Sequence, residues 1–292
     1  MKPLQGKIAV VAGATRGAGR GIAMMLGEAG ATVYVTGRST KGNLSSMGRT
    51  ETIEETAELV TKQGGKGFAV RVDHTVEEDI KELFERIQIE QNGQLDILVN
   101  DVWGGDPLTE WGKPFWEHNL HNGLLMQQRA VHSHMMTSYY GVPLMMKNKK
   151  GLVIEITDGV DYQYRGNLYY SLAKISTIHL AEAMAEDLEK HHITAVAVSP
   201  GFLRSEAMLD LFGVTEENWQ EGAKKDPHFI ASETPFFIGR AIAALASDSN
   251  VHNKTGKALS SWELAREYGF KDIDGRQPDW GKYFEENVIS ER

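Results

Sequence analysis

The sequence has no cysteine, and none of its apolar runs approaches the length of a membrane span. Without thiols the chain can form no disulfide, no thiolate metal site and no cysteine nucleophile. A helix that crosses a bilayer needs about 20 predominantly apolar residues, whereas the apolar stretches here are interrupted by Gly, Lys or Glu. We therefore expect a cytoplasmic protein with no secretory leader and no membrane partner.

An excess of positive charge is also missing. The 292 residues include 31 Lys and Arg against 40 Asp and Glu, which gives a formal net charge of −9. This balance provides no electrostatic reason to bind nucleic acid or anionic lipid, although it leaves room for a local basic pocket that binds a phosphate. The sequence has no fixed-period repeat, and its 41% of hydrophobic residues suffice for a large core.

Short β-branched runs alternate with longer helical patterns along the chain. Such alternation is typical of right-handed crossovers and of a parallel sheet covered by helices on both faces. The sequence therefore predicts an α/β fold with a doubly wound, Rossmann-type parallel sheet in three α/β/α layers. We expect strands at residues 7–12, 31–37, 66–72, 95–100, 151–156 and 193–198, and helices at residues 19–30, 50–63, 76–91, 123–146 and 169–190.

The domain organisation follows from the absence of a linker. Nothing between residues 1 and 262 has the composition of a domain boundary, so we expect one domain there. Residues 263–292 are polar and contain Gly269, Gly275, Pro278 and Gly281. This composition predicts an irregular C-terminal extension.

A glycine-rich turn follows the first expected strand and opens the first helix, with glycines in a GxxxGxG pattern. Glycine lets the backbone bend sharply and approach a pyrophosphate, which the N–H groups at the helix start then hold. A turn of this kind can also be purely structural, but its place between the first strand and the first helix favours a dinucleotide site. The expected cofactor-binding residues of the turn are Gly13, Thr15, Arg16, Gly17, Ala18 and Gly19.

The end of the second strand indicates which dinucleotide binds. NAD-binding sheets usually place an acid there to accept from the ribose 2′-hydroxyl. This chain has Arg38, Ser39 and Thr40 in its place, with no carboxylate nearby in the sequence. Arg38 and Arg16 together predict a clamp on a 2′-phosphate and hence NADP(H), the alternative being two solvated surface arginines.

Tyr170 and Lys174 stand four residues apart at the start of the helix after the fifth strand. Residues at this spacing share one helix face. An ammonium beside a phenol favours the phenolate, so we expect the tyrosine pKa to be drawn toward the working pH. The pair alone is common on protein surfaces, but its combination with the glycine turn and an Asn-ended fourth strand is specific.

With these motifs the sequence resembles the short-chain dehydrogenase/reductase family over about residues 4–262. The stretches around Pro114-Phe115-Trp116-Glu117 and Ser199-Pro200-Gly201 resemble one branch of that family in particular. The resemblance implies that Tyr170 is the general acid/base and that Lys174 binds the nicotinamide ribose while activating Tyr170. It also implies that Thr157, thirteen places before the tyrosine, supplies the hydroxyl that positions the substrate oxygen.

Further positions match the cofactor-binding motifs of the family. Asp73 matches the acid that meets the adenine, and Asn100 matches the first residue of an Asn-Asn-Ala-Gly motif. Pro200 and Gly201 match a Pro-Gly turn near the nicotinamide, and Ser205 stands where a Thr is frequent. The family's relatives also imply a homodimer or homotetramer, and residues 202–233 correspond to a substrate lid, with a static surface excursion as the alternative.

Three positions depart from the family pattern. Thr157 replaces a serine and adds a methyl group, and Trp103 brings a large indole into a region that is normally small. Ala130 stands where the family has a catalytic Asn, which helps to hold a water through its main-chain carbonyl. Alanine keeps the carbonyl, and Gln127 or Gln128 would have to turn inward to replace the amide. We expect a divergent catalyst rather than an inactive one.

The resulting hypothesis is an NADP(H)-dependent oxidoreductase that moves a hydride between the nicotinamide and a small-molecule carbonyl or alcohol. The alternative is a catalytically impaired NADP(H)-binding sensor or interaction protein. No metal is expected, because the histidines at positions 118, 121, 132 and 134 lack a supporting set and are expected on helix surfaces. Aromatic residues in the loops predict either a bulky apolar substrate pocket or simple packing.

Overall fold

A computed structural model describes residues 2–44 and 48–289 of the chain. Its centre is a parallel sheet with the strand order β3-β2-β1-β4-β5-β6-β7. The chain therefore starts in the middle of the sheet, winds to one edge and then to the other, which confirms the doubly wound fold. The strands are β1 (Ile8–Ala12), β2 (Thr32–Gly37), β3 (Lys66–Arg71), β4 (Ile97–Asn100), β5 (Gly151–Ile156), β6 (Ile193–Ser199) and β7 (Ala258–Ser260).

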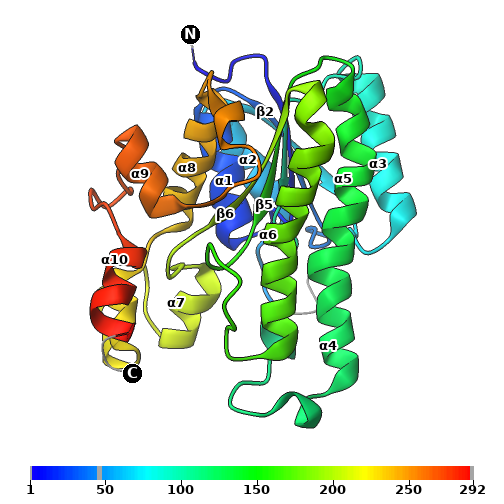
Figure 1. Cartoon of the computed structure of the whole chain (residues 1–292). Helices are drawn as coiled ribbons and strands as arrows, with labels where there is room; N and C mark the ends of the chain where they lie inside the picture. Colours follow the sequence, from blue (N-terminus) through cyan, green and yellow to red (C-terminus); the bar gives the residue numbers. More distant parts are fainter. Residues whose placement is uncertain (1, 45–47, 290–292) are drawn as a thin grey trace.

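Helices cover both faces of the sheet (Figure 1). One face packs against α1 (Gly17–Glu28), α2 (Ile53–Lys62) and α8 (Pro235–Ser247). The opposite face packs against α3 (Glu77–Glu90), α5 (Ser133–Met146) and α6 (Leu168–Leu188). Beyond these layers lie α4 (Leu120–Gln127), α7 (Glu206–Phe212), α9 (Ser261–Tyr268) and α10 (Trp280–Phe284). Within the described ranges, no helix is both long and apolar enough to cross a membrane.

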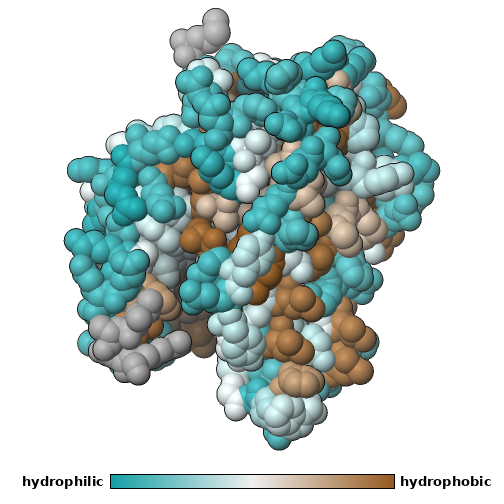
Figure 2. Space-filling view, viewed as in Figure 1, coloured by the Kyte–Doolittle hydropathy of each residue, from teal (hydrophilic) through white to brown (hydrophobic). Residues whose placement is uncertain are grey.

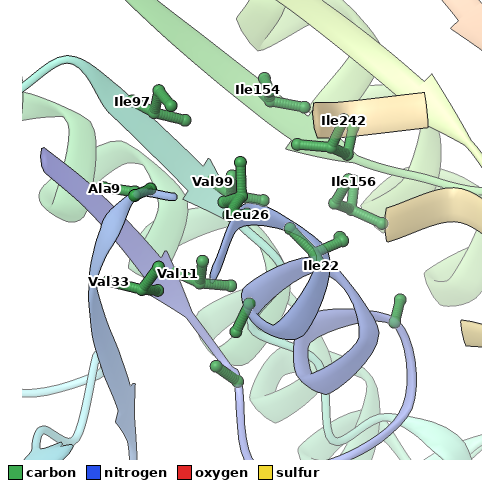
Figure 3. Packing of buried hydrophobic residues seen from close by; sticks show 14 of the residues in the cluster. Ala9, Val11, Ile22, Leu26, Val33, Ile97, Val99, Ile154, Ile156 and Ile242 are labelled. Atoms are coloured by element: carbon green, nitrogen blue, oxygen red, sulfur yellow. The ribbon is translucent and has the colours of Figure 1, made fainter. Parts of the chain in front are cut away.

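The core is continuous because successive strand residues alternate between the two faces. In β1, Val11 packs in the cluster under α1, whereas Val10 belongs to the cluster on the other face. Ile22 and Leu26 of α1 lie over Val11 and its neighbours in the sheet (Figure 3). Both are completely buried, and each such side chain contributes about 1.5–3 kcal/mol. This packing fixes the start of α1 above the end of β1.

The six strands expected from the sequence agree with β1 to β6 to within two residues at either end. The sequence did not predict β7, because three residues are too short to produce a periodic pattern. The helix expected at residues 123–146 is longer and contains a π-helical turn, Gln128–His132, between α4 and α5. Ala130 lies in this turn and is buried.

The expected lid, residues 202–233, contains α7 and is anchored by a buried arginine. Arg204 is 1% exposed. Its guanidinium pairs with Glu216 at 2.7 Å and with Asp274 at 3.2 Å, and it stacks 4.0 Å from the centroid of the Trp219 ring. Arg276 lies against the same ring at 4.4 Å. The lid is therefore held by the C-terminal tail.

The tail is more ordered than its composition predicts. The expected boundary at residue 262 falls inside α9, where Trp262 and Leu264 are buried. Asp272 is also buried and accepts a hydrogen bond from the backbone N–H of Thr234 at 2.8 Å. This order comes from buried apolar side chains and from a buried carboxylate that accepts hydrogen bonds. Counts of glycine and proline do not detect either feature.

Candidate active site

A cleft of about 660 Å³ opens at the carboxyl ends of the strands, above the point where the strand order reverses between β1 and β4. Open α/β sheets bind ligands at this switch point. Eleven of the expected site residues line the cleft, ten of them expected to bind the cofactor and one, Thr157, expected to position the substrate: Gly13, Thr15, Arg16, Gly17, Ala18, Arg38, Ser39, Asp73, Thr157, Lys174 and Pro200. Gly19, Asn100, Gly201 and Tyr170 are not part of its lining.

The glycine turn has the backbone geometry that its sequence predicts. Gly13 has φ +85°, and a Cβ there would lie 2.4 Å from the carbonyl oxygen of Asp101. No other residue type fits at this position without displacing the end of β4. The turn delivers the start of α1 to the cleft, where the backbone N–H of Gly17 donates to Glu206 Oε2 at 2.8 Å. The Glu206 carboxylate, from the expected lid, thus already binds a backbone N–H that would otherwise be free to bind an anion.

The two arginines of the expected clamp both reach the cleft. Arg16 Nη1 is buried and makes no hydrogen bond within the described residues. Burial lowers the pKa of Arg16, while the neighbouring Glu51 carboxylate, 3.8 Å away, opposes the shift. Arg38 Nη1 lies 3.8 Å from Asp73 Oδ2. A buried cation without a hydrogen-bond acceptor fits a phosphate group.

Glu51 qualifies the expectation that no carboxylate lies near the clamp. It is bound by Arg49, which donates to it through Nη2 at 2.6 Å. Sequence reasoning missed Glu51 because it follows the second strand by fourteen residues and reaches the cleft only through the fold. Its charge is shared between Arg49 and Arg16, so the cleft retains cationic character.

Asn100 is placed beside the cleft instead of in its lining. Its side-chain amide donates to Ser138 Oγ at 2.9 Å and to Glu155 Oε1 at 2.7 Å. Glu155 in turn pairs with His134 at 2.6 Å, and His134 also contacts the carbonyl oxygen of Val102 at 3.1 Å. This buried network holds the end of β4 against α5. His134 is therefore a core residue, which corrects the expectation that it lies on a helix surface.

Tyr170 and Lys174 lie one turn apart at the start of α6. The side chain of Asn167 caps this helix by accepting from the Tyr170 N–H at 3.0 Å. Trp103 packs edge-on against the Tyr170 ring at 5.5 Å between centroids, and Trp111 packs on it at 5.3 Å. The Lys174 ammonium lies 4.0 Å from the Trp103 ring centroid. The Trp103 indole, which was expected to crowd this region, therefore contacts both the Lys174 ammonium and the Tyr170 ring.

The residue beside the phenol is Asp158 and not Thr157. Tyr170 Oη donates to Asp158 Oδ2 at 2.7 Å. The hydroxyl of Thr157 donates to the Lys174 carbonyl oxygen at 2.7 Å. The thirteen-residue spacing selected Thr157, whereas the carboxyl group in contact with the phenol belongs to the next residue, Asp158, twelve places before Tyr170.

The pKa of Tyr170 is raised well above its ordinary value, contrary to the sequence-based expectation. Burial is the main cause, and the negative charge of Asp158 adds to it. Burial also lowers the pKa of Lys174, although the surrounding aspartates oppose that shift. Asp101 is buried near Lys174, and burial raises its pKa to about 7. The phenol is therefore neutral near pH 7 and the site is rich in carboxyl groups.

The position of the family's catalytic Asn gives a further difference. Ala130 lies in the π-helical turn, and Gln127, at the end of α4, donates its side-chain amide to the Tyr169 carbonyl oxygen at 2.8 Å. Gln127 thus turns inward and binds α4 to α6 next to Tyr170. Within the described residues, no group of three or more His, Asp or Glu side chains is arranged to hold a metal ion.

Comparison with known proteins gives consistent results. Residues 7–212 match the family described as short chain dehydrogenase. The Mus musculus protein named Dehydrogenase/reductase SDR family member 1 is 36% identical over 278 residues, which cover 94% of this chain and 85% of that protein. The Homo sapiens protein of the same name is 34% identical over the same shares. The stretches around Pro114 and Ser199 predicted similarity to this branch, and these relatives confirm it.

A solved structure supports the architecture. A putative dehydrogenase from Xanthomonas campestris superposes with a TM-score of 0.77 at 21% sequence identity, covering 94% of both chains. At this identity the likeness shows the fold and no more.

Proposed function

The chain belongs to the short-chain dehydrogenase family, whose oxidoreductases use a nicotinamide cofactor, and from this premise we propose that it transfers a hydride between NADP(H) and a small-molecule carbonyl or alcohol. The observation that carries the proposal is a single cleft that joins the glycine turn at one end to Lys174 at the other. The turn offers N–H groups to a pyrophosphate, and Lys174 leads to the phenol of Tyr170 one helical turn away.

The preference for NADP(H) rests on the cations of the cleft. Arg16 has a buried Nη1 with no acceptor among the described residues, and Arg38 lies at the end of β2 where NAD-binding sheets usually have an acid. Ser39 lines the same part of the cleft. Together they offer a 2′-phosphate two guanidinium groups and a hydroxyl. Asp73, held by the Thr75 N–H at 3.0 Å, is the proposed contact to the adenine.

In the proposed reaction Tyr170 gives a proton to, or takes one from, the substrate oxygen. A bound nicotinamide would supply or accept the hydride at its C4 position. Lys174 is proposed to hold the ribose hydroxyls of the cofactor. Thr157 is assigned a positioning role, because its hydroxyl binds the Lys174 carbonyl and so ties the end of β5 to α6. The glycine turn, Asn100, Pro200 and Gly201 complete the proposed cofactor environment.

The experiment is the Tyr170→Phe variant, with Tyr169→Phe as the matched control. Losing a general acid/base lowers turnover by about 10²- to 10⁴-fold, so Tyr170→Phe should be nearly inactive while its Kd for NADPH changes by less than about twofold. Tyr169 packs against His118 at 5.9 Å between ring centroids, and its variant should remain active. Equal turnover in wild type and Tyr170→Phe would remove the phenol from the mechanism.

A second function is favoured by one specific observation. The Trp103 indole covers the Lys174 ammonium at 4.0 Å, and Tyr170 already donates to Asp158. Both contacts involve groups that catalysis requires, namely the lysine ammonium and the phenol. Such contacts are compatible with a protein that binds NADP(H) without turning it over. Tight NADPH binding combined with no turnover of a broad panel of carbonyls and alcohols would support this alternative.

We further propose a homodimer or homotetramer in the cytoplasm. Figure 2 shows apolar residues gathered over the lower parts of α4 and α6. Three large apolar side chains of these two helices are more than half exposed, namely Leu120, Leu124 and Leu172. Apolar patches of this kind mark interaction surfaces. Sedimentation velocity of the whole protein tests the assembly, and a monomer at micromolar concentration would refute it.

A further inference from the structure

The contact between Asp158 and Tyr170 gives the site a carboxyl group where a hydroxyl was expected. Asp158 is the second residue after β5, and its Oδ2 accepts the phenolic hydrogen at 2.7 Å. The neighbouring Thr157 hydroxyl points to a backbone carbonyl of α6. A hydroxyl can donate to a substrate oxygen at any pH near 7, whereas a carboxyl group donates only when it is protonated. The replacement therefore changes the proton chemistry of the site.

Two cationic side chains lie near the pair of Asp158 and Tyr170. From α6, the Lys174 ammonium acts electrostatically on both Asp158 and Tyr170. From the preceding loop, Arg165 donates through Nε to the Asp158 carbonyl oxygen at 2.6 Å. These two cations offset the carboxylate.

Two further acids, Asp101 and Asp106, approach the site from the segment after β4. Asp106 accepts from the Trp103 indole N–H at 2.7 Å. Asp101 lies near Lys174 and shares its charge. Besides Asp158, the charges of Asp106 and Arg165 act on the pKa of Tyr170, the first raising it and the second lowering it. The Lys174 ammonium therefore interacts electrostatically with three aspartates, and one of them, Asp158, is in direct contact with the phenol of Tyr170.

We propose that Asp158 is the proton partner of Tyr170, so that the two side chains form a relay that takes the proton of an alcohol substrate. The proposal rests on the proposed function. As the substrate O–H bond breaks, its proton goes to Tyr170 Oη while the phenolic proton goes to Asp158 Oδ2. The C–H bond breaks with its electron pair passing to the oxidised nicotinamide, and the C=O bond forms. Tyr170 remains neutral throughout, which its buried position requires.

The relay predicts opposite pH dependences for the two directions. Alcohol oxidation needs Asp158 as a carboxylate, because the carboxylate receives the proton. Carbonyl reduction needs Asp158 as a carboxylic acid that returns a proton to Tyr170. Without that proton, the phenol that has protonated the substrate would become a phenolate next to a carboxylate. Two negative charges in contact are strongly disfavoured in a buried site. Oxidation should therefore rise with pH and reduction should fall with pH, through the same ionisation.

The first measurement follows the ionisation of Tyr170 in the protein without cofactor. Tyrosine labelled with ¹³C at Cζ gives an NMR resonance that shifts when the phenol ionises, and Tyr170→Phe identifies the resonance of Tyr170. In Asp158→Asn the phenol loses a negative neighbour and should ionise at lower pH than in the wild type. The control is Asp187→Asn, because Asp187 is an exposed residue near the far end of α6 and its variant removes the same charge. This control should leave the resonance unchanged.

The second measurement is the pH profile of turnover in both directions. Asp158→Asn should lower oxidation by about 10²- to 10⁴-fold, the loss expected for a general base. Asp158→Ser restores a hydroxyl, so its reduction rate at pH 8 should exceed that of the wild type. A Tyr170 resonance unaffected by Asp158→Asn, together with unchanged pH profiles in an active enzyme, would overturn the relay alone. A wild-type protein that turns over no carbonyl or alcohol would overturn the proposed function instead.

Discussion

Replacing Glu206 with Gln tests whether the lid competes with the cofactor for the glycine turn. Glu206 Oε2 accepts from the Gly17 N–H at 2.8 Å, and Oε1 lies 3.9 Å from Arg20 Nε. The proposed cofactor places its pyrophosphate on the same N–H groups at the start of α1. The carboxylate must therefore leave before a phosphate can bind there, and its removal should strengthen cofactor binding.

The size of the effect follows from the kind of hydrogen bond that is broken. A hydrogen bond to a charged group contributes about 1.5–3 kcal/mol, and a neutral one about 0.5–1.5 kcal/mol. The Glu206 side chain is 29% exposed, so the lower ends of these ranges apply. Glu206→Gln should thus reduce the cost of opening the turn by about 1 kcal/mol, which corresponds to about fivefold tighter binding.

The assay is a calorimetric or fluorescence titration of the purified protein with NADPH and with NADH. Both nucleotides carry the pyrophosphate, so Glu206→Gln should lower both Kd values by a similar factor. The matched control is Glu217→Gln, an exposed lid position outside the cleft lining, which removes the same charge from the lid. Unchanged or weaker binding in Glu206→Gln, or an equal gain in Glu217→Gln, would refute the competition.

Two further predictions concern the clamp and the core. Arg38→Asp should weaken NADPH by about tenfold or more relative to NADH, because it removes a charge-assisted bond to a 2′-phosphate; an unchanged ratio of the two Kd values would show that Arg38 faces elsewhere. Burial raises the pKa of Glu233 to about 8, against hydrogen bonds from Ser261 and Gly201 that oppose the shift. Between about pH 4.5, where the carboxyl group of the unfolded chain ionises, and pH 8, the folded protein keeps a proton on Glu233 that the unfolded chain has lost. This group therefore makes the folded protein less stable as pH rises. Glu233→Gln should remove that loss, and urea unfolding should show its stability rising against wild type by roughly 1.4 kcal/mol per pH unit across that window; a constant difference would contradict the buried neutral carboxyl.

The fold could be predicted from the sequence because its signals are local and repeated. Buried β-branched runs such as residues 8–12 give strands, and the glycines at 13 and 17 give a turn with a fixed backbone conformation. These features recur in sequence order, and parallel topology follows from their alternation. The cleft residues near the turn were predicted for the same reason, since each lies within a few residues of a strand end.

The residues around the phenol could not be predicted in this way. Asp158 was missed because the sequence spacing pointed to the hydroxyl of Thr157, and only the folded loop shows which of the two neighbouring side chains contacts the phenol. Glu206 and Glu51 reach the turn only through long-range folding, 189 residues from Gly17 in the case of Glu206. The pKa of Tyr170 depends on burial between two tryptophans, and no sequence spacing reports burial.

The pairing of Arg204 with Asp274 connects the C-terminal tail to residues 202–233, the expected lid. Seventy residues separate the two, yet Asp274 supports the buried guanidinium from which the lid extends. Shortening the chain after α9 would leave that guanidinium with Glu216 as its remaining ion-pair partner among the described residues. The loss of Asp274 would therefore weaken the support of residues 202–233, the segment that the sequence predicts to cover the substrate.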